Sequence, residues 1–178
     1  MLKRINDLQA KFDDIFERKE KILNYQKTLD MGLTENFNQV EDAQMLLMYR
    51  VKLWSSMKQW TESTARWVTQ PFESIEVDEI LTICQQVSKT LLNCERNLPF
   101  STALGYLKKI CFDFKDTMPI VEALSNKNLE AFHWEQIRYV IDNRTFPLEE
   151  KCFKLGELIE LNISKYQDAI VHISVTAT

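Results

Sequence analysis

Turn-forming residues are scarce in this sequence. Its 178 residues include only three glycines and four prolines. Hairpins, β-sandwiches and phosphate-binding loops need more residues of these two types, because tight turns require a positive φ or a fixed one. The scarcity therefore predicts long helices joined by few turns, with Pro71 and Pro99 marking breaks between helices and Pro119 the beginning of one.

The first 31 residues carry an apolar heptad repeat. Its main row recurs every seven residues at Leu8, Ile15, Ile22 and Leu29. A companion row starts with Ile5 and Phe12 but continues with Lys19 and Gln26, so the pattern weakens toward its end. Such spacing is typical of helices that pack along one narrow stripe. We expect the main row to form a seam for a partner helix, and Gly32 to end the helix.

Helical periodicity continues through the rest of the chain. The expected helices span about 34–68, 75–98, 101–114, 119–124, 128–142 and 155–175. Residues 142–147 read as a loop, with or without a short extended piece. The final β-branched residues lack a stop signal, so the last helix is expected to continue past Thr178. The fold predicted is an elongated all-α array of about seven helices, with a coiled-coil-like pair at its N-terminus.

Three tryptophans, Trp54, Trp60 and Trp67, lie in the second expected helix. They could form a platform for a cation or a sugar. Large rings at helical spacing are more often part of the core, where each buries about 150–250 Å². We therefore expect the three rings to join this helix to the next ones.

Charge and cysteine usage narrow the functional class. The net charge of −4 provides no basic stripe for nucleic acid. No apolar run approaches the roughly 20 residues that a membrane helix needs, and no secretory signal is visible. Without such a signal or a C-x-x-C motif, the four cysteines are expected to be reduced, mostly buried thiols of a cytosolic protein. They are Cys84, Cys94, Cys111 and Cys152.

The stretch LEAFHWEQI, residues 129–137, offers the one residue that invites a catalytic interpretation. On a helix, however, Glu135 lies two positions from His133 and cannot orient its ring. His133 is more simply a packed residue with a local hydrogen bond, and Trp134 a ring that fixes this helix to its neighbours. Phosphate-binding glycine motifs, G-x-S-x-G and H-E-x-x-H are absent. The sequence thus predicts no catalytic, cofactor-binding or metal-ligating residue.

Three longer runs resemble the N-terminal part of the linker region of dynein heavy chains. They are LWSSMKQWTESTARWVTQPFESIEVDEI, FDFKDTMPIVEALSNKNLEAFHWEQI and FKLGELIELNISKYQDAIVHISVTA. The residues that carry the resemblance are Trp54, Trp60, Trp67, Pro119, Leu129, His133, Trp134, Leu155 and Gly156. Two positions depart from the family: Phe132 stands where a basic residue is usual, and Lys154 where threonine is common.

This resemblance implies a mechanical function without chemistry of its own. The style is axonemal rather than cytoplasmic, so the expected location is the cytoskeleton of a cilium or flagellum. Residues 43–178 would be the N-terminal part of the linker, truncated at its C-terminal end, and 1–42 a tail-like helix and joint. ATP and Mg²⁺ would bind only in the ATPase ring of the parent heavy chain, and microtubules only its stalk. Expected partners are the ring, the tail and dynein intermediate or light chains, with no nucleic acid and no membrane.

Two other functions are compatible with this sequence. A stand-alone helical adaptor would use the N-terminal heptad to bind a partner coiled coil. An all-α enzyme would need a second titratable group next to His133, and the sequence indicates none.

Overall fold

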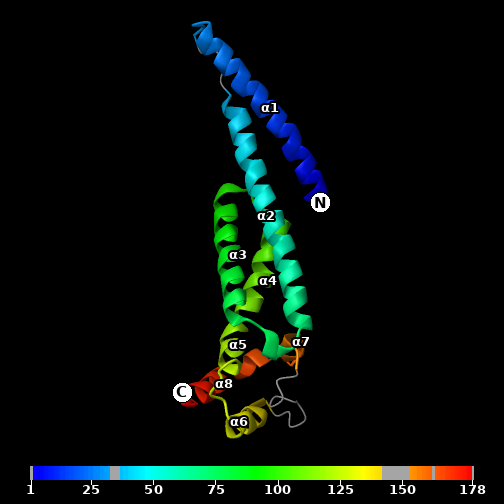
Figure 1. Cartoon of the computed structure of the whole chain (residues 1–178), viewed down its shortest axis with the longest axis vertical. Helices are drawn as coiled ribbons and strands as arrows, with labels where there is room; N and C mark the ends of the chain where they lie inside the picture. The colour runs from blue at the N-terminus through cyan, green and yellow to red at the C-terminus, as the bar shows by residue number, and fades with distance from the viewer. Residues whose placement is uncertain (1, 33–36, 142–152, 162, 178) are drawn as a thin grey trace. The chain divides into compact units, whose positions relative to one another are not determined.

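A computed structural model describes residues 2–32, 37–141, 153–161 and 163–177 (Figure 1). The chain forms two compact units. Unit 1 comprises Met1–Lys58 and Thr90–Gly105, and unit 2 comprises Gln59–Lys89 and Tyr106–Thr178.

The elements formed by the described residues are helices, which confirms the predicted all-α class. The α-helices are α1 (Leu2–Thr28), α2 (Asn38–Thr69), α3 (Val77–Asn97), α4 (Thr102–Lys115), α5 (Met118–Leu124), α6 (Ala131–Ile141), α7 (Leu155–Glu160) and α8 (Gln167–Thr176). Two short 3₁₀ helices are η1 (Phe72–Ser74) and η2 (Ile163–Tyr166). Helices α2, α3 and α4 each contribute residues to both units.

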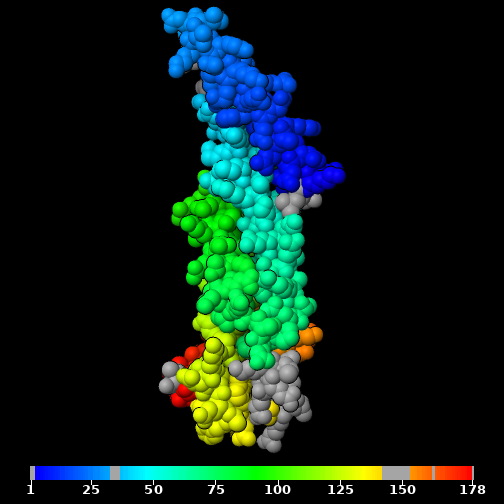
Figure 2. All heavy atoms as spheres, in the orientation of Figure 1, coloured from blue at the N-terminus to red at the C-terminus, as the bar shows by residue number. Residues whose placement is uncertain are grey.

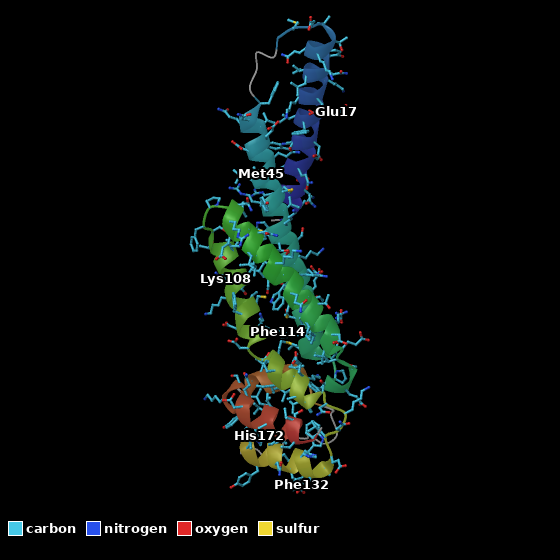
Figure 3. All side chains as sticks on the ribbon, turned by 90° about the vertical axis from the view of Figure 1, so that its left-hand side faces the viewer. Glu17, Met45, Lys108, Phe114, Phe132 and His172 are labelled. Atoms are coloured by element: carbon cyan, nitrogen blue, oxygen red, sulfur yellow. The ribbon has the colours of Figure 1, made fainter. Side chains whose placement is uncertain are left out.

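Unit 1 contains α1 and the first part of α2, which run antiparallel side by side (Figures 1 and 3). Lys19 of α1 is only 6% exposed and forms an ion pair with Glu41 of α2. Its ammonium lies 4.7 Å from the ring centre of Phe16 and 5.9 Å from that of Phe37. Aromatic faces attract cations, so these two rings and one carboxylate compensate the cost of burying the charge.

The prediction that Gly32 ends the first helix is wrong. Asp30 adopts the left-handed conformation, with φ 50°. The N–H of Met31 donates to the carbonyl of Gln26 at 3.0 Å, and the N–H of Asp30 to that of Lys27 at 3.4 Å. This pair of bonds is the Schellman motif, and aspartate tolerates the left-handed conformation better than most side chains. Asp30 therefore closes α1 two residues before the glycine.

In unit 2, α8 packs against both α5 and α6. The parts of α2, α3 and α4 in this unit bury apolar side chains at helical spacing: Trp60, Trp67, Ile80, Ile83, Cys84, Val87, Leu107, Cys111 and Phe114. An ion pair between Arg66 and Glu79 connects α2 with α3.

The N-termini of two helices follow the sequence prediction. Ser101 Oγ accepts the N–H of Leu104 at the start of α4, and Pro119 lies in the first turn of α5.

The last predicted helix, 155–175, is interrupted. The structure divides it into α7, η2 and α8. Tyr166, which precedes α8, has φ −107° and ψ 13°, outside the helical region. Ser164 lies at this point, and serine is less favourable inside a helix than the apolar residues around it. Apolar periodicity alone did not reveal this break. The predicted loop at 142–147 and the expected helix start at Thr34 lie outside the described residues.

Candidate functional site: a closed helix junction in unit 2

Trp60 and Trp67 of α2 form an aromatic cluster with Phe114 of α4, labelled in Figure 3. The two indole rings meet edge to face at 6.1 Å and 86°. Phe114 lies 5.4 Å from Trp60 at 88° and 5.6 Å from Trp67 at 31°. Both tryptophans are buried, and edge-to-face pairs add about 0.5–1.5 kcal/mol beyond area burial. The cluster therefore fixes the end of α2 to α4, as the sequence predicted for these two tryptophans.

Trp54, the third predicted ring, lies in the part of α2 that belongs to unit 1. Its side chain is only half-buried. It is therefore not part of the aromatic cluster, although it shares the helix.

The end of α2 is joined to the start of α7 by a short antiparallel backbone pairing. Pro71 and Lys154 form an isolated β-bridge, and the N–H of Phe72 donates to the carbonyl of Phe153 at 2.9 Å. The rings of Phe72 and Phe153 stack with 4.7 Å between centres at an interplanar angle of 25°. Both side chains are buried. Two segments 81 positions apart are thus paired through both backbone and side chains.

Gly156 allows α7 to come close to the last turn of α2. A Cβ at this position would lie 2.6 Å from Val68 Cγ1 and 3.1 Å from the Val68 carbonyl oxygen. The neighbouring side chains Leu155 and Leu158 are buried. In the Leu-Gly-x-Leu pattern, the two leucines are therefore buried in the core, and the glycine lets α7 approach Val68 of α2 closely. We call the group Phe72, Phe153, Lys154 and Gly156 with Val68 the junction.

Lys154 precedes the first residue of α7. Its side chain makes no cap hydrogen bond, but its backbone N–H donates to Glu157 Oε2 at 3.1 Å. Half of a capping box is thus present, because the reciprocal bond needs a side-chain oxygen that lysine lacks.

A polar network joins α5 to α8. Ser174 is buried, and its hydroxyl donates to the carbonyl of Ala123 at 2.9 Å. Asn126 Nδ2 donates to the Ser174 carbonyl at 3.0 Å and to its hydroxyl at 3.2 Å. These bonds satisfy buried polar atoms and fix the position of α8 along α5.

His133 has the local hydrogen bond expected of it. Its Nδ1 accepts the backbone N–H of Glu130 at 3.1 Å, at the start of α6. The ring is half-buried and meets Phe132 edge to face at 5.7 Å, while Phe132 itself remains 62% exposed. Trp134 and Leu129 are buried, and Glu135 is exposed. His133 thus acts as an N-terminal cap of α6, and Trp134 packs as predicted.

The three described cysteines, Cys84, Cys94 and Cys111, are free and buried, as the sequence predicted. Burial, with a smaller contribution from Cys111, raises the pKa of Cys84 to about 11. Burial also raises the pKa of Cys94 and of Cys111 above the ordinary value. The thiols are therefore protonated at neutral pH and poor nucleophiles. Cys152 lies outside the described residues.

Sequence reasoning missed the partners that make the junction and the α5–α8 network: Phe72, Phe153, Asn126 and Ser174. Phe72 follows Pro71 in a segment read only as a helix break. Nothing local signals that it pairs with Phe153, because the pairing is long-range. The predicted seam on α1 belongs to unit 1.

The aromatic cluster, the junction and the α5–α8 network are packing and hydrogen-bond contacts within the described ranges. No group of three or more His, Cys, Asp or Glu side chains there is placed to hold a metal ion. Within the same ranges, no helix has both the length and the apolarity required to cross a membrane.

Comparison with known proteins shows which family this chain resembles. Residues 40–178 match the family described as "Dynein heavy chain, N-terminal region 2". The chain is 24% identical over 174 residues to human dynein axonemal heavy chain 6, covering 98% of this chain and 4% of that protein. It is 25% identical over 127 residues to the Chlamydomonas reinhardtii dynein-1-beta heavy chain of the flagellar inner arm I1 complex. This match covers 71% of this chain and 3% of that protein. Human dynein axonemal heavy chain 2 is 26% identical over 129 residues, with the same coverages of 71% and 3%.

The chain therefore spans only a few per cent of the length of these relatives. The family match nevertheless extends over most of the chain, from the start of α2 through the junction to α8. This chain belongs to the dynein heavy chain family, within its N-terminal region 2.

Proposed function

We propose that this chain is a non-catalytic mechanical element, the segment in which the linker and the tail of a dynein heavy chain meet. In this role it passes nucleotide-driven movement of an ATPase ring to a cargo-attached tail in ciliary motility. The segment itself uses no cofactor; ATP and Mg²⁺ act in the ring, and microtubules bind elsewhere on the motor. The partners proposed are the ring, the tail and intermediate or light chains of an axoneme.

The observation that carries this proposal is the junction. A force-bearing element needs contacts that do not yield when one end is displaced, and close-packed interiors have few soft degrees of freedom. The bridge between Pro71 and Lys154, the stacked rings and the close approach at Gly156 join the ends of α2 and α7 in three different ways. Weakening one of them should weaken transmission without touching nucleotide chemistry.

The test replaces the matching segment of the Chlamydomonas dynein-1-beta heavy chain with residues 40–178 of this chain. We expect this chimera to move microtubules. A second chimera carrying Gly156→Val should hydrolyse ATP at the same rate but move microtubules more slowly, because the added side chain separates α7 from α2. Gly105→Ala is the matched control, since its nearest neighbour outside the helix backbone is 3.8 Å away. Equal velocities for the Gly156→Val and Gly105→Ala chimeras would refute the mechanical role of the junction.

A second candidate function is binding of a partner helix through the seam on α1. It is favoured by the exposure of Leu8, Ile15, Ile22 and Leu29.

A further inference from the structure

Helix α1 carries two heptad rows, and only one of them packs within the chain. The companion row is covered: Ile5 and Lys19 are buried, and Phe12 and Gln26 are half-buried. The ion pair of Lys19 with Glu41 shows that α2 lies on this side. Residues seven apart stay within a narrow band of a helix surface, so α2 covers the companion row along the helix.

The main row faces away from this contact. Leu8, Ile15, Ile22 and Leu29 are 51%, 46%, 42% and 67% exposed. With a rise of about 1.5 Å per residue, the row extends over roughly 30 Å. Figure 2 shows the surface of α1, in blue, uncovered along the helix in that view. An apolar row of this length is typical of a helix that packs against two neighbours, one on each face.

A row of basic residues borders the exposed row on the side away from α2. Arg4, Lys11 and Arg18 are spaced by seven and all are exposed. Each lies four residues before a member of the apolar row, at Leu8, Ile15 or Ile22, and therefore next to it on the surface. Arg18 pairs with Asp14 at 2.9 Å, but both side chains are largely exposed, so this bond is weak and exchangeable.

We propose that this face of α1 binds an amphipathic helix whose apolar stripe is bordered by acidic residues. Leucines or isoleucines of the partner would cover the exposed row. Its glutamates or aspartates would meet the heads of Arg4, Lys11 and Arg18, whose aliphatic stems extend the apolar surface. This proposal does not rest on the mechanical role of the junction, whose residues lie in the other unit.

Charge also decides against two other occupants. Packed antiparallel, a second copy of α1 would bring its own basic row against this one, and like charges across an interface disfavour association. Packed parallel, it would meet the flank that α2 already covers. An anionic membrane would attract the basic row, but Asp7 and Asp14 lie three residues after Arg4 and Lys11 on the same side of the helix. These carboxylates would be driven toward the lipid phosphates. A partner helix, in contrast, can place its acidic residues opposite the basic row and away from Asp7 and Asp14.

The experiment uses two synthetic 28-residue peptides with the same leucine heptads, one bordered by glutamate and the other by lysine. Binding to the intact 178-residue chain is measured by fluorescence anisotropy at low and high salt. We expect the glutamate peptide to bind and the lysine peptide to bind about tenfold more weakly or not at all. Salt should weaken the binding of the glutamate peptide.

Two variants of the chain separate the charged and apolar contributions. Arg4→Glu/Lys11→Glu/Arg18→Glu should invert the preference between the two peptides. Ile15→Asp/Ile22→Asp should abolish binding of both. Leu92→Asp, at an exposed position of α3 in the same unit, is the matched control and should leave binding unchanged. All substituted side chains are exposed, so circular dichroism should show the same helix content for every variant.

Three outcomes would overturn the proposal. They are equal affinity for the two peptides, binding to neither, and binding that survives Ile15→Asp/Ile22→Asp. A dimer at micromolar concentration in sedimentation, lost in that variant, would identify a second copy as the occupant instead. Binding to phosphatidylserine vesicles without binding to the glutamate peptide would identify a membrane.

Discussion

Gly156 lies where two helices approach more closely than a side chain allows. In an exposed helix, replacing glycine by alanine usually stabilises by about 0.5–1 kcal/mol, because alanine loses less backbone entropy on folding. Here the added Cβ would meet the Val68 side chain at 2.6 Å and the Val68 carbonyl oxygen at 3.1 Å. The carbonyl belongs to the last turn of α2 and cannot move without disturbing that helix. Because of this close contact, alanine at position 156 should destabilise the fold, although it usually stabilises an exposed helix.

We expect Gly156→Ala to lower the free energy of unfolding by about 1–3 kcal/mol, the usual cost of overpacking. Urea denaturation followed by circular dichroism measures it. The matched control Gly105→Ala, also in a helix, should be neutral or stabilising, because its Cβ would find only Phe100 at 3.8 Å. Val68→Ala should recover part of the loss when combined with Gly156→Ala, since it removes the closest atom. A stabilising effect of Gly156→Ala alone would show that α7 does not sit against α2 as described.

Buried aromatic rings attach helix α2 to α4 within unit 2, in addition to the ion pair between Arg66 and Glu79 that connects it with α3. Trp60 and Trp67 are seven residues apart, so both rings emerge on one face and reach Phe114 together. An element attached in this way resists bending at the cluster, because each ring is held by two others.

Trp60→Ala should cost about 3–5 kcal/mol of unfolding free energy, the range for a fully buried large ring. Chemical denaturation of the 178-residue chain measures the loss. Trp54→Ala is the comparison within the same helix, and we expect a clearly smaller loss because Trp54 is only half-buried. A loss of unfolding free energy below roughly 1 kcal/mol for Trp60→Ala would show that the aromatic cluster does not stabilise the fold as proposed.

Elements were predictable from the sequence where a local pattern specifies them. Apolar spacing located α3, the proline located the start of α5, and Ser101 the start of α4. The break between α7 and α8 and the stop at Asp30 were missed, because apolar periodicity carries no information about single backbone conformations. The junction was only half predicted: Gly156 was singled out by resemblance, but its neighbour Val68 and the pair Phe72–Phe153 are long-range. On α1 the heptad was visible, yet only the structure shows which row faces α2.

At the scale of the whole chain, two compact units share three helices. Unit 1 holds the α1–α2 pair with the proposed helix-binding face, and unit 2 holds the junction. Each unit contains buried free thiols: Cys94 in unit 1, and Cys84 and Cys111 in unit 2. Burial raises the pKa of all three, so in the folded chain they should react with thiol reagents only when their surroundings open. The cysteines therefore report separately on the opening of the two units.

We expect Gly156→Ala to accelerate labelling of Cys84 and Cys111 at pH 8 more than labelling of Cys94. The strain enters unit 2, and each 1.4 kcal/mol of lost opening free energy should raise the labelling rate about tenfold. A Cys152→Ser background leaves the three described thiols as reporters, and mass spectrometry of digested peptides assigns the label to each. If all three rates rise by the same factor, the shared helices make both units open together. Mechanical strain at the junction would then reach the helix-binding unit as a stability change, and the two proposed functions would be coupled.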